Sequence, residues 1–346
     1  MAYSSRLLIV NYVMDSEDPL LSHQQEAVYA LAKEFEHVTV ITGKVGTNKP
    51  SSNVEIISAQ WNPGQKFRNT LRLLVKSLPL ITLGDFNSIF YHMTDLQCAM
   101  LSPFARLRRK KQFLWYAHTS KSFFLRWSSL WVNLVITSTP GSCPIKSKKV
   151  LPIGQAIDES QFSKLSLEDM NLNKLIHIGR FDKSKRIESL IQAAVQLRDD
   201  NKEIELKLVG SPANEESKIW AKDLALKYVN QTELGWLSFE SSISRNQFRA
   251  KMKDSGCFFH GYIGSLDKTL VESTMLCVPV VTVNPEYIKV FGPWSTLEPV
   301  SLISEYRAMR SLSLAELELE LNRRNSLALK KHSLTNWINQ LSLLLK

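Results

Sequence analysis

This 346-residue sequence lacks long apolar runs, cysteines at metal-ligand spacing and the pattern of an N-terminal signal peptide. No apolar run reaches the ~20 residues that a helix needs to cross a bilayer, so no transmembrane helix is expected. The four cysteines, Cys98, Cys143, Cys257 and Cys277, lack metal-ligand spacing and are expected to be reduced core thiols. The first residues also lack the charged, apolar and small-residue pattern of a signal peptide. We therefore expect a cytoplasmic protein.

Acidic residues are scarce in one segment of the first half. Residues 60–130 hold 11 Lys and Arg against 2 Asp and Glu, whereas the rest of the chain holds 32 against 31. Nearly all of the net charge of +10 therefore lies in this segment. Such a patch indicates an anionic partner, which could be a membrane, a nucleic acid or a phosphorylated substrate. The alternative is a solvated surface that aids solubility.

Short runs of Val, Ile and Leu alternate with helical stretches in both halves of the chain. The predicted strands lie at 7–12, 38–42, 54–58, 89–93, 113–117, 134–137, 150–153, 175–178, 206–209, 257–260 and 278–283. This β-α-β alternation predicts an α/β protein with one Rossmann-like parallel sheet in each half. The expected divisions are an N-terminal domain at 1–155, a second domain at 156–300, and helices at 301–346 that could pack back on the N-terminal domain.

Two predicted strand ends in the second half carry polar groups suited to a ligand. Ligands of open α/β sheets bind beyond the carboxyl ends of the strands. After the strand at 175–178, Gly179 permits a tight turn, and Arg180 and Lys185 flank a short loop that opens a helix. Two cations at a helix N-terminus suit a diphosphate, although basic residues also occur at helix starts on ordinary surfaces.

The second strand end is followed by the glycine-containing segment 260–272. Its backbone amides could cradle phosphate oxygens. Glu272 would lie about one turn inside the next helix, where its carboxylate could accept hydrogen bonds from both hydroxyls of a ribose. The alternative is a carboxylate that the helix dipole favours at this position.

These motifs, taken in order, resemble the retaining glycosyltransferases of family 4, which have the GT-B fold of two Rossmann-like domains facing a cleft. The order is GRFDKSKR from Gly179, a strand ending in KLVG, GSLDKTLVE from Gly264, and VPVVT. In that family an Arg and a Lys five residues later hold the donor diphosphate, and Arg180 and Lys185 match both. The second glutamate of a Glu-x7-Glu motif binds the ribose, and Glu272 matches it. The segments HVTVIT, FYHMTD, LWYAHTS and VITST extend the resemblance through the first half.

The resemblance implies a set of site residues. Arg180, Lys185 and His118 are the expected catalytic residues, because family members often carry a histidine near the transferred sugar at the position of His118. The expected donor-binding residues are Gly179, Gly264, Ser265, Leu266, Asp267, Lys268, Thr269 and Glu272.

Three residues depart from the family pattern. Gly264 stands where the first glutamate of the paired motif is expected, so no carboxylate holds the sugar there. Cys277 and Arg186 stand where the family usually has glycine. These departures put the choice of sugar in question.

The resemblance implies retaining transfer of a hexose-type sugar from a nucleotide-sugar to an acceptor hydroxyl, in cell-envelope glycan or glycolipid synthesis. No cofactor or metal is expected, because the sequence lacks an Asp-x-Asp motif and the two cations supply the positive charge. No nucleic-acid recognition motif accompanies the basic segment. The alternatives are a nucleotide-sugar epimerase of the same fold and a catalytically degenerate protein that binds a sugar nucleotide.

The basic segment also contains a candidate membrane-binding helix. Phe67, Leu71, Leu74, Val75 and Leu78 fall on one predicted helical face. Arg68, Arg72 and Lys76 form the neighbouring stripe, and Arg108 and Arg109 follow along the chain. An apolar face beside a basic stripe is typical of a helix lying in an anionic membrane surface. The acceptor would then be lipid-linked, at the inner face of the plasma membrane. The alternative is a helix that packs its apolar face on the sheet.

Overall fold

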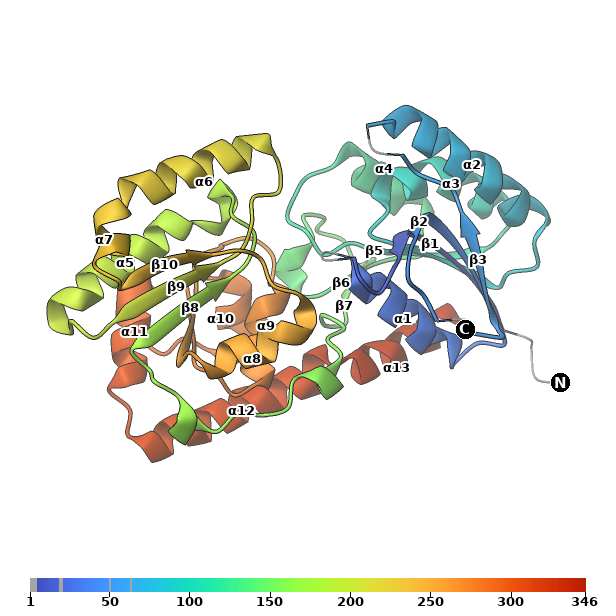
Figure 1. Ribbon diagram of the computed structural model, residues 1–346. Helices are drawn as coiled ribbons and strands as arrows, with labels where there is room; N and C mark the ends of the chain where they lie inside the picture. The colour runs from blue at the N-terminus through green and yellow to red at the C-terminus, as the bar shows by residue number, and fades with distance from the viewer. Residues whose placement is uncertain (1–4, 19–20, 50, 63) are drawn as a thin grey trace. The chain divides into compact units, whose positions relative to one another are not determined.

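The computed structural model describes residues 5–18, 21–49, 51–62 and 64–346. The chain forms two compact units, one of residues 1–156 with 334–346 and one of residues 157–333 (Figure 1). Each unit is a parallel β-sheet covered by helices, so the expected fold class of two Rossmann-like domains is confirmed.

The first domain has a seven-stranded sheet in the order β3-β2-β1-β4-β5-β6-β7. Its strands are β1 Arg6–Met14, β2 His37–Val45, β3 Val54–Ser58, β4 Ser88–His92, β5 Lys111–Trp115, β6 Leu134–Thr137 and β7 Val150–Pro152. Its helices are α1 Ser22–Ala32, α2 Lys66–Leu83, α3 Asp95–Leu107, α4 Phe123–Trp131 and α13 Leu334–Leu345.

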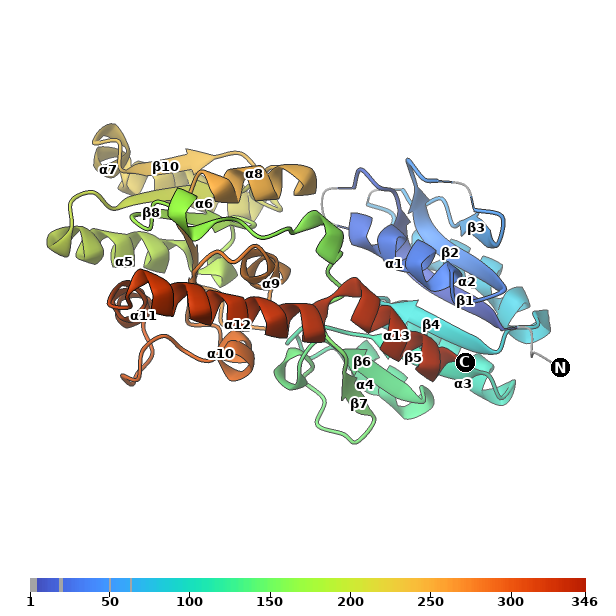
Figure 2. The ribbon, with the colours of Figure 1, turned by 90° about the horizontal axis from the view of Figure 1, so that it is seen from below.

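Alternate residues of β1 pack into two different cores because successive strand side chains point to opposite faces. Leu7 and Ile9 join α1 and α13 on one face, where α13 lies against β4 (Figure 2). Leu8 and Val10 join α2, α3 and α4 on the other face. This burial on both faces explains why the strands are nearly continuous apolar runs.

The second domain has a five-stranded sheet in the order β10-β9-β8-β11-β12. Its strands are β8 Lys174–Ile178, β9 Glu205–Val209, β10 Leu237–Glu240, β11 Cys257–His260 and β12 Val280–Thr282. Its helices are α5 Ile187–Asp200, α6 Glu215–Lys227, α7 Val229–Glu233, α8 Phe248–Lys253, α9 Lys268–Met275, α10 Pro285–Phe291, α11 Leu302–Arg310 and α12 Leu314–His332. Helices α5, α6 and α11 cover one face of the sheet and α8, α9 and α10 the other.

Three features differ from the sequence-based expectations. The edge strand β10 was not predicted, because only four residues of mixed polarity form it. The C-terminal helices are divided between the units, since α11 and α12 belong to the second unit, whereas α13 packs in the core of the N-terminal domain. In α2 the predicted apolar face does not coincide with the buried face, because the fully buried residues are Leu73, Ser77 and Ile81. Leu74 and Leu78 pack at the edge of that core, whereas Phe67, Leu71 and Val75 are exposed.

Candidate functional site

The two predicted loops of the second domain follow adjacent strands. Strands β8 and β11 are paired in parallel, with Cys257 opposite Leu175 and Phe258 opposite Ile176. The segment 179–185 leaves β8, and the segment 261–267 leaves β11 and opens α9. Parallel pairing puts both loops at the same edge of the sheet, where α/β proteins bind ligands.

Lys185 is the point at which the two loops meet. Its ammonium group forms an ion pair with the Asp267 carboxylate and lies 4.2 Å from the ring centroid of Tyr262. The Lys185 side chain is only 9% exposed. Burial raises the pKa of Asp267, but the Lys185 charge and the hydrogen bond from His260 outweigh it, so the pKa of Asp267 lies well below its usual range. Asp267 therefore stays ionised and fixes Lys185 in place.

Two buried histidines lie next to this ion pair: His260 contacts Asp267, and the His177 ring lies 5.9 Å from the His260 ring. His260 Nε2 donates to Asp267 Oδ2 at 3.3 Å, because a carboxylate can only accept, and Nδ1 lies 3.3 Å from the Thr282 hydroxyl. Burial lowers the pKa of His260, and burial together with the neighbouring His260 lowers the pKa of His177 to about 3. Both imidazoles are therefore neutral at pH 7.

Glu272 is buried in α9 and pairs with an arginine that the sequence-based reasoning missed. Its Oε1 lies 3.0 Å from an Nη2 of Arg245, and its side chain is 7% exposed. Arg245 begins the short 3-10 helix Arg245–Gln247 and stacks 5.6 Å from the ring of Phe162. A buried carboxylate requires a cation, but nothing local to the sequence identifies which of the 43 Lys and Arg residues supplies it.

Asn284 is a second functional residue that the sequence-based reasoning missed. Its Nδ2 lies within hydrogen-bond distance of three carbonyl oxygens of the glycine-containing loop, at 3.0 Å from Tyr262, 3.4 Å from Gly264 and 3.2 Å from Ser265. Its Oδ1 accepts from the Tyr287 amide and caps α10. Asn284 thus fixes the conformation of the loop that leads into α9.

The remaining predicted donor residues lie around this centre. Arg180 is half-exposed, with Nε 3.9 Å from Asp182 Oδ2. A Cβ at Gly179 would lie 3.0 Å from His177 Nε2, so a larger residue there would require the buried His177 ring to shift. The Thr269 hydroxyl is buried and has no hydrogen-bond partner among the described residues. The Leu266 side chain packs into the core, so only its backbone is available to a ligand.

The residues predicted in the first domain lie on the loop after β5, on α2 and directly after α3. Strand β5 ends at Trp115, two residues earlier than expected, and His118 lies exposed in the following loop, where its Nδ1 accepts from the Ser120 amide at 3.0 Å. Arg68, Arg108 and Arg109 are exposed. Arg72 and Lys76 donate to the carbonyl oxygens of Gln60 and Ser58 at 2.8 and 2.5 Å.

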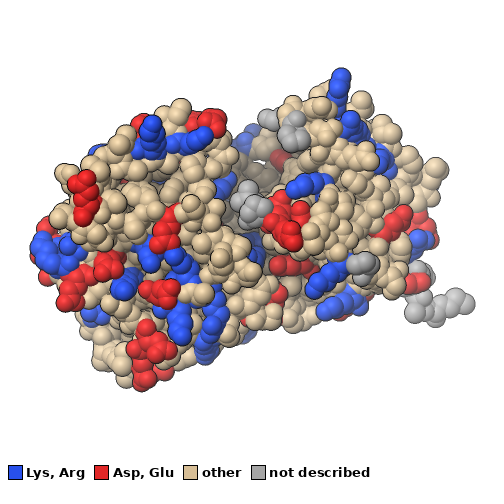
Figure 3. Space-filling view, in the orientation of Figure 1, with Lys and Arg blue, Asp and Glu red and all other residues tan. Residues whose placement is uncertain are grey.

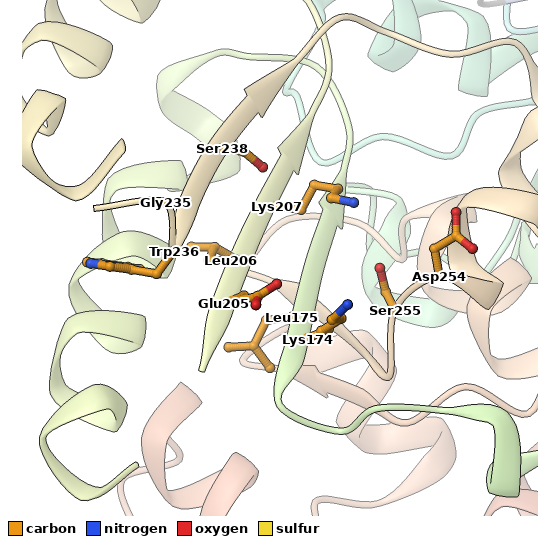
Figure 4. Close-up of a pocket in the computed structure, with 10 residues that line it drawn as sticks. All are labelled: Lys174, Leu175, Glu205, Leu206, Lys207, Gly235, Trp236, Ser238, Asp254 and Ser255. Carbon is orange, nitrogen blue, oxygen red and sulfur yellow. The ribbon is translucent and has the colours of Figure 1, made fainter. Parts of the chain in front are cut away.

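Two cavities of the second domain lie outside this centre. One of about 50 Å³ lies at the amino ends of β8, β9 and β10, between Lys174, Glu205 and Trp236 (Figure 4), which is the opposite end of the sheet from the two loops. The other, of about 220 Å³, is lined by Asp182, Lys183, Ser184, Glu216, Ser217 and Trp220, beside the Arg180 loop. Only the second is placed to extend the candidate site.

Within the described part of the chain, no cluster of His, Cys, Asp and Glu side chains could hold a metal ion. None of the described helices is both long and apolar enough to span a bilayer.

Comparisons with known proteins agree with this arrangement. Residues 158–291, which include both loops, match the family described as glycosyl transferases group 1. The Anabaena protein HepE, solved with UDP and glucose, is 13% identical with a TM-score of 0.73, covering 97% of this chain and 98% of that one. A sucrose-phosphate synthase from Thermosynechococcus elongatus is 15% identical with a TM-score of 0.72, covering 98% of each chain. A glycosyltransferase from Rickettsia africae is 11% identical with a TM-score of 0.71, covering 99% and 98%.

Among curated proteins, none is similar enough in sequence to count as a relative of this chain. The structural similarity extends over both domains, so the chain has the GT-B fold. The matched segment and this fold together support a glycosyltransferase of the GT-B type.

Proposed function

We propose that this protein is a retaining glycosyltransferase of the family 4 type, which transfers a hexose from a nucleotide-sugar to an acceptor hydroxyl. One observation carries the proposal. The ion pair between Lys185 and Asp267 joins the cationic loop after β8 to the glycine-containing loop after β11. This contact supports assigning the cations, the loop amides and the buried Glu272 to one site, inside the segment matched as glycosyl transferases group 1.

The donor is a nucleoside diphosphate sugar. HepE has been solved with UDP and with UDP-glucose, which supports the same class of donor for this chain. Arg180 and Lys185 would bind the diphosphate together with the loop amides of residues 264–269. Glu272 would accept hydrogen bonds from the ribose hydroxyls while it remains paired with Arg245.

Asp267 has a positioning role in this proposal. An ammonium group has three donors, so Lys185 can keep its bond to Asp267 and still reach the diphosphate. Arg180 is then the less neutralised of the two cations, because its nearest carboxylate, Asp182, is 3.9 Å away.

The transfer breaks the bond from the anomeric carbon to the diphosphate oxygen and forms one to the acceptor oxygen on the same face of the sugar. The acceptor proton passes to the leaving diphosphate, so no protein base is required. Negative charge on the diphosphate grows toward the transition state, and Arg180 and Lys185 stabilise it. These cations would supply the positive charge that a divalent ion supplies in other enzymes, and His118 would be a further catalytic residue.

The acceptor is proposed to be a lipid or a lipid-linked sugar at the inner face of the plasma membrane. Helices α2, α3 and α4 cover one face of the first sheet. Their outer sides expose eleven large apolar residues: Phe67, Leu71, Val75, Leu83, Met100, Phe104, Leu107, Phe123, Phe124, Trp127 and Leu130. Lys and Arg side chains lie over α2 (Figure 3), and the segment 60–130 carries only two acidic residues. An apolar surface framed by cations suits an anionic membrane.

A catalytically degenerate sugar-nucleotide-binding protein is the second candidate, and Gly264 and Cys277 favour it. Such a protein would bind nucleotide but leave the donor intact with every acceptor. A nucleotide-sugar epimerase would instead release a free epimer without an acceptor.

A thermal-shift screen of UDP-, GDP- and ADP-sugars tests the proposal. Ligand at 100 times its dissociation constant adds about 2.7 kcal/mol of stability, which is readily measured. With the donor found, Arg180→Ala and Lys185→Ala should mainly lower turnover, and Arg180→Lys should not rescue a bidentate contact fully. NMR of the product should show the anomeric configuration of the donor. Normal turnover in both alanine variants, or an inverted product, would refute the proposal.

A further inference from the structure

Tyr262 occupies the space beside Gly264 in the glycine-containing loop. A Cβ built on Gly264 would overlap the hydroxyl oxygen and Cζ of Tyr262, well inside the 3.0 Å that real side-chain carbons keep. The backbone at Gly264 does not have a positive φ. A side chain at position 264 would therefore have to displace the Tyr262 phenol, whereas the backbone there imposes no strain.

The Tyr262 ring also belongs to the proposed diphosphate site. The Lys185 ammonium lies 4.2 Å from its centroid, which is cation–π distance. The His260 ring packs edge-on against it at 6.3 Å, and Asn284 Nδ2 donates to its carbonyl oxygen at 3.0 Å. Contacts therefore fix both the backbone and the ring of Tyr262. Its hydroxyl group consequently has a fixed position next to Lys185.

We propose that the Tyr262 hydroxyl hydrogen-bonds the transferred sugar and helps to determine which sugar the site accepts. This inference rests on the proposed function. A diphosphate oxygen bound by Lys185 would lie beside the Tyr262 ring, and the sugar is the next group along the donor. The phenol is only half-buried, so its oxygen can reach a ligand. The phenol hydroxyl is uncharged and can both donate and accept, so it would hydrogen-bond a sugar hydroxyl without adding negative charge to the site.

The geometry couples positions 262 and 264, and a double-mutant cycle measures this coupling. Tyr262→Phe removes only the hydroxyl, while Gly264→Ala should displace it. Both should weaken binding of the nucleotide-sugar about 3- to 10-fold, as for one lost hydrogen bond. Tyr262→Phe keeps the ring beside Lys185, so it should leave binding of the nucleoside diphosphate unchanged. In a Tyr262→Ala background, which opens the space, Gly264→Ala should have no further effect.

The cycle uses titration calorimetry with UDP and UDP-glucose, or with the GDP or ADP pair if the screen selects it. Tyr306→Phe is the matched control, because it removes a hydroxyl that donates to the Leu172 carbonyl oxygen in the same domain. Selective loss for the sugar conjugate supports the inference. The inference is overturned if Tyr262→Phe changes the affinity for both ligands equally, or if the effects of Tyr262→Ala and Gly264→Ala are additive. Either result leaves the proposed function intact. A wild-type protein that binds neither ligand overturns both.

Discussion

At the scale of residues, Arg186 and Cys277 are among the non-glycine residues with a positive φ, a conformation that glycine adopts more easily. Arg186 and Cys277, at the two positions where the family resemblance expects glycine, have φ values of 53° and 60°. A side chain in this left-handed region costs roughly 1 kcal/mol. Arg186 also lies directly before α5, where glycine is acceptable as a cap. At both departures noted in the sequence, a side chain therefore stands on backbone of the left-handed conformation that glycine tolerates best.

Arg186→Gly should raise the free energy of unfolding by about 0.5–1 kcal/mol, because relief of strain exceeds the added freedom of the unfolded chain. Urea unfolding at pH 7 measures this. Arg186→Ala is the control, since alanine keeps the Cβ and should gain nothing. An equal gain in both variants would show that charge at this position, and not φ, limits stability.

At the scale of elements, strand β8 and helix α12 each place a titratable imidazole inside the second domain. Burial lowers the pKa of His177 to about 3, and that of His332 at the end of α12 to about 4. The unfolded chain binds protons below about pH 6.5, whereas these folded rings stay neutral. Stability should therefore fall as the pH drops from 7 to 5, by roughly 1–2 kcal/mol for each ring.

Urea unfolding of the second domain at pH 7, 6 and 5 tests this pH dependence. His177→Asn can keep a donor to the Phe259 carbonyl oxygen, which His177 Nδ1 contacts at 3.1 Å, but it cannot titrate. This variant should lose less stability than the wild type on acidification. The same slope in both proteins would exclude His177 as a source of the pH dependence.

The elements were predictable where the signal was local. Strands β8 and β11 and the loops after them follow from apolar runs that end at Gly179 and Gly261. The contacts that complete the site were not predictable, because they join residues far apart in the sequence. Arg245 and Glu272 are 27 positions apart. Asn284 is about 20 positions from the loop carbonyls to which it donates. Helix α2 shows a further limit, since periodicity identified an amphipathic helix but not which of its apolar residues face the core.

On the scale of the whole molecule, most of the net charge lies in residues 60–130, and α2, α3 and α4 of this segment expose eleven large apolar residues. Phe67, Leu107 and Phe123 are 82%, 80% and 73% exposed, respectively. Reversing Arg68, Arg72 and Lys76 to Glu should abolish binding to vesicles of phosphatidylglycerol and phosphatidylcholine, because each cation near such a surface contributes about 1 kcal/mol. Nucleotide affinity should not change. High salt should weaken wild-type binding by screening.

Vesicle sedimentation measures this, and reversal of Lys202, Lys218 and Lys222 in the second domain is the matched control. The control variant should bind as the wild type does. Wild-type protein that ignores anionic vesicles at low salt would contradict the membrane proposal and favour a soluble acceptor.

The central claim is that the second domain binds a nucleoside diphosphate through the loops around Lys185 and Glu272. Calorimetric titration of Glu272→Gln with the nucleotide found in the screen tests it most directly. The substitution keeps the shape of a buried side chain that pairs with Arg245. Glu305→Gln is the control, because Glu305 is equally buried but accepts from the backbone amides of Trp294 and Ser295. We predict a dissociation constant raised about 10- to 100-fold by Glu272→Gln and unchanged by Glu305→Gln. Unaltered affinity in a folded Glu272→Gln protein would contradict the assignment of this site.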